Sequence, residues 1–172
     1  AGVPVMLNPA PATDLDDELL RYVTYLTPNE QEAATETGLP LRMENGILCR
    51  DDLTSIAQAL RQRGVENVII TLGGNGSAVA EPDGVRYIPC VRMDHVADPT
   101  AAGDSFVGAL SVGLTAGLSR EQALIFASHT AAITVSRMGA MPSLPKLNEV
   151  VDLLCQRDCR AFPLSALDVL RT

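Results

Sequence analysis

The chain has 172 residues, of which 47% are hydrophobic and 20% are charged, so it can bury a core and is not a disordered segment. Its formal net charge of −8 argues against a nucleic-acid-binding surface, because such surfaces are basic. No apolar run is long enough to cross a bilayer, and the four cysteines form no C-x-x-C pair. We therefore expect no membrane partner, no zinc site and a reducing, cytoplasmic location.

The N-terminal part of the chain alternates short apolar runs with helical patterns. Strands are predicted over 3–7 and 22–26, each followed by proline, and helices over 14–20 and 30–37. The segment 41–50 is interpreted as an irregular loop. The next segment has helical period and predicts a helix over 51–63, with Gly64 as its C-cap.

The strongest strand pattern covers 67–72 and runs into the tight glycine turn 73–76. A hairpin is predicted from 77–80 and 85–89. Three helices follow. The first is predicted over 104–116 and the last over 145–156. The middle helix begins with the capping-box pattern of Ser119 and Gln122 and continues to 131 or 135. Strands that alternate with helices predict an α/β layered fold with a largely parallel sheet. We predict one domain over 1–156 and assign no function to the tail 157–172.

The most informative stretch runs from Asp98 to Phe106, with the sequence Asp-Pro-Thr-Ala-Ala-Gly-Asp-Ser-Phe. Small residues lead directly into a helical pattern, and the unpaired N–H groups of a helix N-terminus attract anions such as phosphate. A carboxylate at this place, Asp104, is better suited to take a proton from an attacking hydroxyl. The stretch therefore favours phosphoryl transfer to an alcohol. Taken alone, Asp104 is equally well explained as an N-cap.

Three further segments end a predicted strand or begin a predicted helix: 29–32, 71–76 and 137–143. Ligands of open α/β sheets bind at the carboxyl ends of the strands. We therefore expect these segments to gather around the same ligand as 100–104.

In these segments the sequence resembles the ribokinase-type sugar kinases of the PfkB carbohydrate kinase family. The stretch 98–106 is similar to the family pattern D-T-x-[GA]-A-G-D-x-F, the segment 29–32 to N-x-x-E, and the segment 71–76 to T-L-G-x-x-G. The resemblance runs from about residue 3 to residue 155, with extra length near 41–51. It implies a three-layer ribokinase-like fold, with a mostly parallel central sheet, whose N-terminal portion and lid are missing from this chain.

The resemblance also implies roles in catalysis and nucleotide binding. Asp104 would be the general base and would contact the sugar hydroxyl. The anion hole would be formed by the backbone N–H groups of Ala101, Ala102, Gly103 and Asp104. The residues that would line the ATP site are Asn29, Thr71, Leu72, Gly73, Gly74, Asn75, Gly76, Gly103, Asp104 and Ser128, with Ser128 near the adenine.

Two metal ions are implied as cofactors besides ATP. Asn29 and Glu32 would place Mg²⁺ and its waters near the phosphates, Glu32 through water. The family also uses a monovalent cation, often K⁺. Its ligands, mostly backbone carbonyls, would be Asp98, Thr100, Thr134, Arg137, Gly139 and Ser143.

Several of these residues have a purely structural alternative when each is considered by itself. Glu32 is typical of a solvated helix residue, and the glycines can form only a hairpin turn. Asp98 can begin a turn, and Ser128 and Thr134 fit ordinary helix positions. Arg137 can cap a helix C-terminus through its charge.

Two positions depart from the family pattern. Pro99 stands where the pattern has Thr, which removes one backbone N–H. Ser128 stands where ribokinases often carry His or Asn, and the two histidines, His95 and His129, receive no role.

The resemblance implies ATP-dependent phosphorylation of the primary hydroxyl of a sugar, with D-ribose to D-ribose 5-phosphate as the first expectation. The alternatives are another kinase of the family (a fructokinase, a nucleoside kinase or another pentose kinase) and a catalytically incomplete nucleotide-binding fragment. The full-length protein is expected to be a homodimer formed through the lid, with sugar and ATP as its small-molecule partners.

Overall fold

The structure, a computed structural model, describes residues 2–44, 46–157, 162 and 164–170. The chain divides into two compact units, Ala1–Pro89 and Cys90–Thr172, and each unit is described by itself. The predicted division into a domain over 1–156 and a separate tail stays a prediction.

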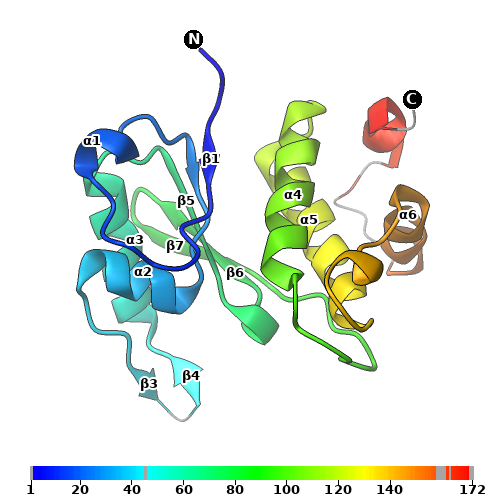
Figure 1. The fold of residues 1–172 in the computed structure, drawn as a ribbon, viewed down its shortest axis with the longest axis horizontal. Coiled ribbons are helices and arrows are strands. Elements are labelled where there is room, and N and C mark those ends of the chain that lie inside the picture. The colour runs from blue at the N-terminus through cyan, green and yellow to red at the C-terminus, as the bar shows by residue number, and fades with distance from the viewer. Residues whose placement is uncertain (1, 45, 158–161, 163, 171–172) are drawn as a thin grey trace. The chain divides into compact units, whose positions relative to one another are not determined.

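The first unit is built on a five-stranded sheet with the strand order β1-β2-β5-β6-β7 (Figure 1). The strands are β1 (Met6–Leu7), β2 (Tyr25–Leu26), β5 (Asn67–Thr71), β6 (Ser77–Glu81) and β7 (Gly84–Ile88). The first three run parallel, and β6 and β7 extend the sheet as antiparallel neighbours. The predicted α/β fold with a mostly parallel sheet is confirmed, as is the predicted hairpin of β6 and β7.

The helices of this unit are α1 (Asp17–Leu20), α2 (Glu30–Thr37) and α3 (Arg50–Gln62). Helix α3 places Leu53, Ile56 and Leu60 on one face because they recur at helical spacing, and all three are buried. Val68 and Ile70 alternate along β5 and belong to the same buried cluster. The core of the unit thus lies between α3 and the sheet.

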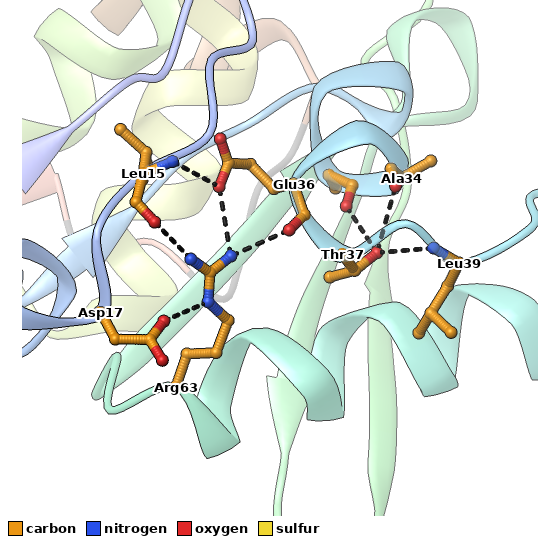
Figure 2. A network of polar contacts seen from close by, with 8 residues as sticks. Leu15, Asp17, Ala34, Glu36, Thr37, Leu39 and Arg63 are labelled. Atoms are coloured by element: carbon orange, nitrogen blue, oxygen red, sulfur yellow. Dashed lines mark hydrogen bonds and ion pairs between the residues drawn. The ribbon is translucent and has the colours of Figure 1, made fainter.

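A guanidinium joins three segments of the first unit (Figure 2). Arg63, directly after α3, donates to Asp17 Oδ1 at 2.6 Å, to the carbonyl of Leu15, and to both the carbonyl and the carboxylate of Glu36 at 2.8 and 3.2 Å. The Glu36 side chain is fully buried. Its oxygen Oε1 has no hydrogen-bond partner among the described residues. A buried carboxylate is costly unless it is paired, so Arg63 is what makes Glu36 tolerable here.

The prediction of a loop over 41–50 is wrong. Two short strands, β3 (Met43–Glu44) and β4 (Ile47–Leu48), form an antiparallel hairpin there (Figure 1). Gly46 supplies the positive φ that the hairpin turn needs, at 79°. An Asn-Gly dipeptide is a hairpin signal, and the sequence carries one at 45–46.

Several other predicted elements exist with shorter or shifted bounds, since the ends of strands and helices are set by pairing and caps that periodicity does not report. Strands β1 and β2 and helix α1 each begin three residues after their predicted starts. Helix α2 has its predicted bounds and ends at Gly38, with φ of 64°. The C-cap of α3 is Arg63, and Gly64 follows it with φ of 106°.

The second unit is helical. Helices α4 (Ala102–Thr115) and α5 (Arg120–Val135) lie side by side, and α6 (Leu147–Gln156) packs against α5 (Figure 1). Two short 3₁₀ helices, η2 (Met141–Ser143) and η3 (Leu164–Leu170), complete the unit. The capping box of Ser119 and Gln122 is confirmed at the start of α5. A Cβ at Gly113 would lie 3.2 Å from the Cβ of Ala123, so the close approach near the α4–α5 turn favours glycine.

Among the described residues, no helix is long and apolar enough to span a membrane. Cys49, Cys90 and Cys155 are free thiols, and Cys159 lies outside the described residues. The described part of the chain also contains no group of three or more His, Cys, Asp or Glu side chains arranged to hold a metal.

Candidate functional site

The N-x-x-E segment of the first unit forms a reciprocal cap at the start of α2. Asn29 Oδ1 accepts the N–H groups of Gln31 and Glu32 at 2.9 and 2.8 Å, and Glu32 Oε2 accepts the N–H of Asn29 at 2.7 Å. Glu32 is therefore a half-buried capping residue rather than a solvated one. Its second oxygen, Oε1, bonds to no described residue, which leaves one carboxylate oxygen for a metal-bound water.

The glycine turn lies beside this cap. The N–H of Thr71, the last residue of β5, donates to the carbonyl of Pro28 at 2.9 Å, and Thr71 pairs with Asn29 in an isolated bridge. The N–H of Leu72 then donates to the carbonyl of Gly76 at 2.8 Å, which closes the turn. The structure thus brings Asn29, Glu32 and Thr71 together in the first unit.

The turn itself is the 3₁₀ helix η1 (Gly73–Asn75), which joins the antiparallel strands β5 and β6. The glycines therefore do form a hairpin turn, as the structural alternative for them predicted. Gly73 and Gly76 have φ of 52° and 93°, which favours glycine at both. The N–H groups of Gly73 and Gly74 bond to no acceptor in the described part of the chain. These exposed donors can accommodate an anion.

In the second unit, α4 begins two residues earlier than predicted, at Ala102, with Ala101 as its N-cap. The alternative that Asp104 is the N-cap is therefore wrong, because it is the third residue of the helix. Ala101 has φ of 61°, a left-handed conformation that L-residues other than glycine rarely adopt. This conformation turns the chain sharply into the helix.

Of the four backbone donors predicted to form an anion hole, three are free. The N–H groups of Ala101, Gly103 and Asp104 bond to no acceptor among the described residues, as expected in a first helical turn. The N–H of Ala102 donates to the carbonyl of Pro99 at 3.2 Å. The Asp104 carboxylate is exposed and has no hydrogen-bond partner in the described chain. It is thus free to receive a proton beside three N–H donors.

Asp104 and Ala101 also line a cavity of about 540 Å³ within the second unit. The other lining residues include Gly108 and Val112 of α4, Phe126 of α5 and Met141 of η2, and Asp104 is the charged residue among those described. A carboxylate on the wall of a largely apolar cavity of this size fits a site for a small organic molecule.

Asp98 connects the segment before α4 to the segment after α5. Its Oδ1 accepts the N–H of Thr100 and its Oδ2 the N–H of Gly139, both at 2.9 Å. Hydrogen bonds from the Thr100 side chain first, and then from the backbone N–H groups of Thr100 and Gly139, hold the pKa of Asp98 below its ordinary value, because they stabilise the charged form. The N–H of Ala97 donates to the carbonyl of Val135 at 2.7 Å and strengthens the same connection.

The residues predicted to bind a monovalent cation gather around this connection. The backbone carbonyls of Thr100, Arg137 and Gly139 accept no hydrogen bond among the described residues. The Ser143 side chain is buried, and its hydroxyl donates to the carbonyl of Ala140 at 2.6 Å. Free carbonyls around a carboxylate fit a cation bound through oxygen.

Thr134 and Arg137 also have structural roles. The Thr134 hydroxyl donates to the carbonyl of Thr130 at 3.0 Å, and the Thr134 carbonyl accepts the N–H of Arg137 at 3.2 Å. The Arg137 guanidinium forms an ion pair with Glu149 of α6. Hydrogen bonds from Arg137 lower the pKa of Glu149. Glu149 was not predicted from the sequence, since nothing in a single chain marks a partner twelve residues away.

Ser128 is half-buried on α5, and its side chain bonds to no described residue. Its neighbour His129 is buried, and Nδ1 lies 2.8 Å from the carbonyl of Ile125. Burial lowers the pKa of His129.

A model of the pfkB family of carbohydrate kinases matches residues 1–147. A bifunctional ribokinase/ribose-5-phosphate isomerase A of Fructilactobacillus sanfranciscensis is 40% identical over 90% of the chain and 28% of its own length. Ribokinase of Haemophilus influenzae is 38% identical, covering 89% of the chain and 48% of its own length. The structure of Arabidopsis thaliana ribokinase complexed with ribose and ATP superimposes with a TM-score of 0.75 at 33% identity, over 89% of this chain and 48% of that one. The chain therefore spans at most about half the length of these relatives.

Proposed function

The chain belongs to the pfkB family of carbohydrate kinases, and on that basis we propose that it carries the ATP-binding and phosphoryl-transfer part of a sugar kinase. Members of this family are phosphotransferases with an alcohol acceptor. The observation that carries the proposal is the start of α4, where the exposed Asp104 carboxylate lies beside the free N–H groups of Ala101, Gly103 and Asp104. This pairing suits the removal of a proton from a sugar hydroxyl while negative charge develops on a transferring phosphoryl.

Each residue has a defined part in this proposal. Asp104 takes the proton of the sugar hydroxyl. The N–H groups of the first turn of α4 bind the oxygens of the phosphoryl group. The glycine turn, with its two free N–H groups, binds phosphates of ATP, and Ser128 contacts the adenine.

Two metal ions belong to the same proposal. Glu32, with one free carboxylate oxygen, and Asn29 hold Mg²⁺ through water, and the ion neutralises phosphate charge when bound. A monovalent cation, K⁺, is held by Asp98 and Ser143 and by the backbone of Thr100, Thr134, Arg137 and Gly139. Its positive charge supports the anion-binding turn of α4.

The proposed acceptor is the primary hydroxyl of D-ribose. The support is the similarity to ribokinases, one of which has a structure in complex with ribose and ATP. We also propose that the whole protein is a cytoplasmic homodimer. A fructokinase or nucleoside kinase activity is the alternative within the family.

The test is an ADP-release assay on the protein that carries this chain, with ribose, fructose and adenosine as acceptors and with and without Mg²⁺. Ribose-dependent ADP release is the expected result. ADP release with fructose or adenosine but not with ribose would identify that compound's class as the substrate instead.

A nucleotide-binding fragment without catalysis is the second candidate, because the chain spans at most about half of its relatives' length. Binding of ATP without ADP release from any acceptor is the result that favours it. Equilibrium ATP binding to the 172-residue chain is measured as well. Both candidates require that ATP binds, and a chain without nucleotide function would not bind it.

A further inference from the structure

One carboxylate of the second unit holds both ends of the loop between α5 and α6. Glu149 Oε1 accepts Arg137 Nη2, and Oε2 accepts Arg137 Nη1 at 3.4 Å and the backbone N–H of Lys146 at 2.8 Å. Arg137 lies just after α5, and Lys146 is the N-cap of α6. The Glu149 side chain therefore joins residues 137 and 146, which are the two ends of this loop.

The loop contains three of the residues proposed as ligands of the monovalent cation: Arg137, Gly139 and Ser143. The carbonyls of Arg137 and Gly139 accept no hydrogen bond among the described residues, and Asp98 holds the N–H of Gly139 at 2.9 Å. The loop is thus fixed at Gly139 by Asp98 and at its ends by Glu149. Because carbonyl ligands have no side chain to adjust, their positions depend on how the backbone is held.

Glu149 also affects the carbonyl oxygens of this loop electrostatically, through its ion pair with Arg137. The Arg137 guanidinium belongs to the residue whose carbonyl is a proposed ligand, and its side chain is only 36% exposed. An uncompensated guanidinium at this place would repel a bound cation, and the water around the partly exposed side chain would screen that repulsion only in part. The ion pair with Glu149, itself 34% exposed, neutralises that charge.

We propose that Glu149 is a positioning residue for monovalent-cation binding, since it neutralises Arg137 and fixes both ends of the loop that supplies the carbonyl ligands. This inference rests on the proposed function. It predicts that loss of Glu149 weakens the cation and leaves the phosphoryl-transfer chemistry intact once the cation is saturating.

The experiment compares Glu149→Gln and Glu149→Ala with the wild type in the protein that carries this chain. Asp152→Asn is the matched control, because Asp152 is an exposed carboxylate on the same helix with no partner among the described residues. ADP release is measured against KCl concentration at saturating ATP and sugar. Binding of Tl⁺, a spectroscopic probe for K⁺ sites, is followed independently by ²⁰⁵Tl NMR.

We expect the half-saturating KCl concentration to rise about fivefold in Glu149→Gln, the scale of one partly exposed ion pair, with the maximal rate within about twofold of wild type. Tl⁺ affinity should fall by the same factor. Glu149→Ala, which also loses the bond to Lys146, should show a larger rise. In an Arg137→Met background, which keeps the carbonyl, Glu149→Gln should have a smaller effect.

Unchanged half-saturation and unchanged Tl⁺ affinity in both Glu149 variants would overturn the inference. Thermal unfolding of Glu149→Gln verifies that the variant is folded. If the wild type phosphorylates sugar without any response to K⁺ or Tl⁺, the positioning role fails while the kinase function stands. If the wild type binds Tl⁺ but releases no ADP, the kinase proposal fails, and the Tl⁺ titration still decides the role of Glu149.

Discussion

The carboxylate of Asp98 accepts the backbone N–H of Gly139 at 2.9 Å, although the two residues are 41 positions apart. This bond ties the segment that leads into α4 to the loop that follows α5. Both segments carry residues of the proposed site, so a single side chain sets their separation within the second unit.

Asp98→Ala should loosen this connection, because it removes the acceptor for both Gly139 and Thr100. The amides of these two residues are expected to exchange with solvent faster, measured by NMR hydrogen exchange. Asp94→Ala is the control, since Asp94 is exposed and has no partner among the described residues. Equal exchange rates at Gly139 in both variants would contradict the role of Asp98.

Asp104→Asn is expected to reduce kcat of the proposed kinase by about 10²- to 10⁴-fold, because an amide cannot accept the hydroxyl proton. ATP affinity should be unchanged or slightly higher, since one negative charge near the phosphates is lost. Single-turnover kinetics and equilibrium ATP binding measure the two effects separately. A variant with wild-type kcat would remove Asp104 from the role of base.

Arg63→Met should destabilise the first unit by about 3–5 kcal/mol, because it leaves the fully buried Glu36 carboxylate without its cation. The double variant Arg63→Met, Glu36→Leu should recover much of the loss, since no buried charge then remains unpaired. Urea unfolding measures the free energies. Arg61→Met, two residues earlier in the last turn of α3, is the control, because the Arg61 side chain has no partner among the described residues and its loss should cost little stability.

The ion pair of Arg42 and Asp52 predicts a pH dependence. Arg42 donates to Asp52 from its backbone N–H and from Nε and Nη2, at 2.8, 2.9 and 2.7 Å, and these bonds lower the pKa of Asp52 to about 2. A folded-state pKa below the ordinary value means that the stabilisation is complete above about pH 4 and is lost as the pH falls through 2. Asp52→Asn should therefore be less stable than wild type at pH 7, and the gap should narrow between pH 4 and pH 2.

The measurement is urea unfolding of both proteins across that pH range. Asp51→Asn, a neighbouring exposed carboxylate, is the control and should show no comparable gap at pH 7. A gap between wild type and Asp52→Asn that stays constant down to pH 2 would contradict the assigned cause.

The sequence by itself determined the fold class and the family. Helical spacing predicted α2 with its bounds, and the capping box of Ser119 predicted the start of α5. Both predictions succeeded because each signal is local and involves residues only a few positions apart. The Asp98–Phe106 stretch predicted a helix start at which donors and a carboxylate meet. The spacing of Asn29 and Glu32 is also that of a capping box, and the family resemblance assigned these residues to nucleotide and Mg²⁺ binding instead.

Tertiary structure decided the relationships that join distant segments. The bond from Asp98 to Gly139 and the ion pair of Glu149 with Arg137 depend on how helices pack, and no local pattern encodes them. The bond from Lys146 to Glu149 is a local cap at the start of α6. The left-handed conformation of Ala101 is likewise imposed on a residue that disfavours it. Local periodicity fixes which face of an element is buried. The placement of individual carbonyls and carboxylates follows only from the packing of those faces.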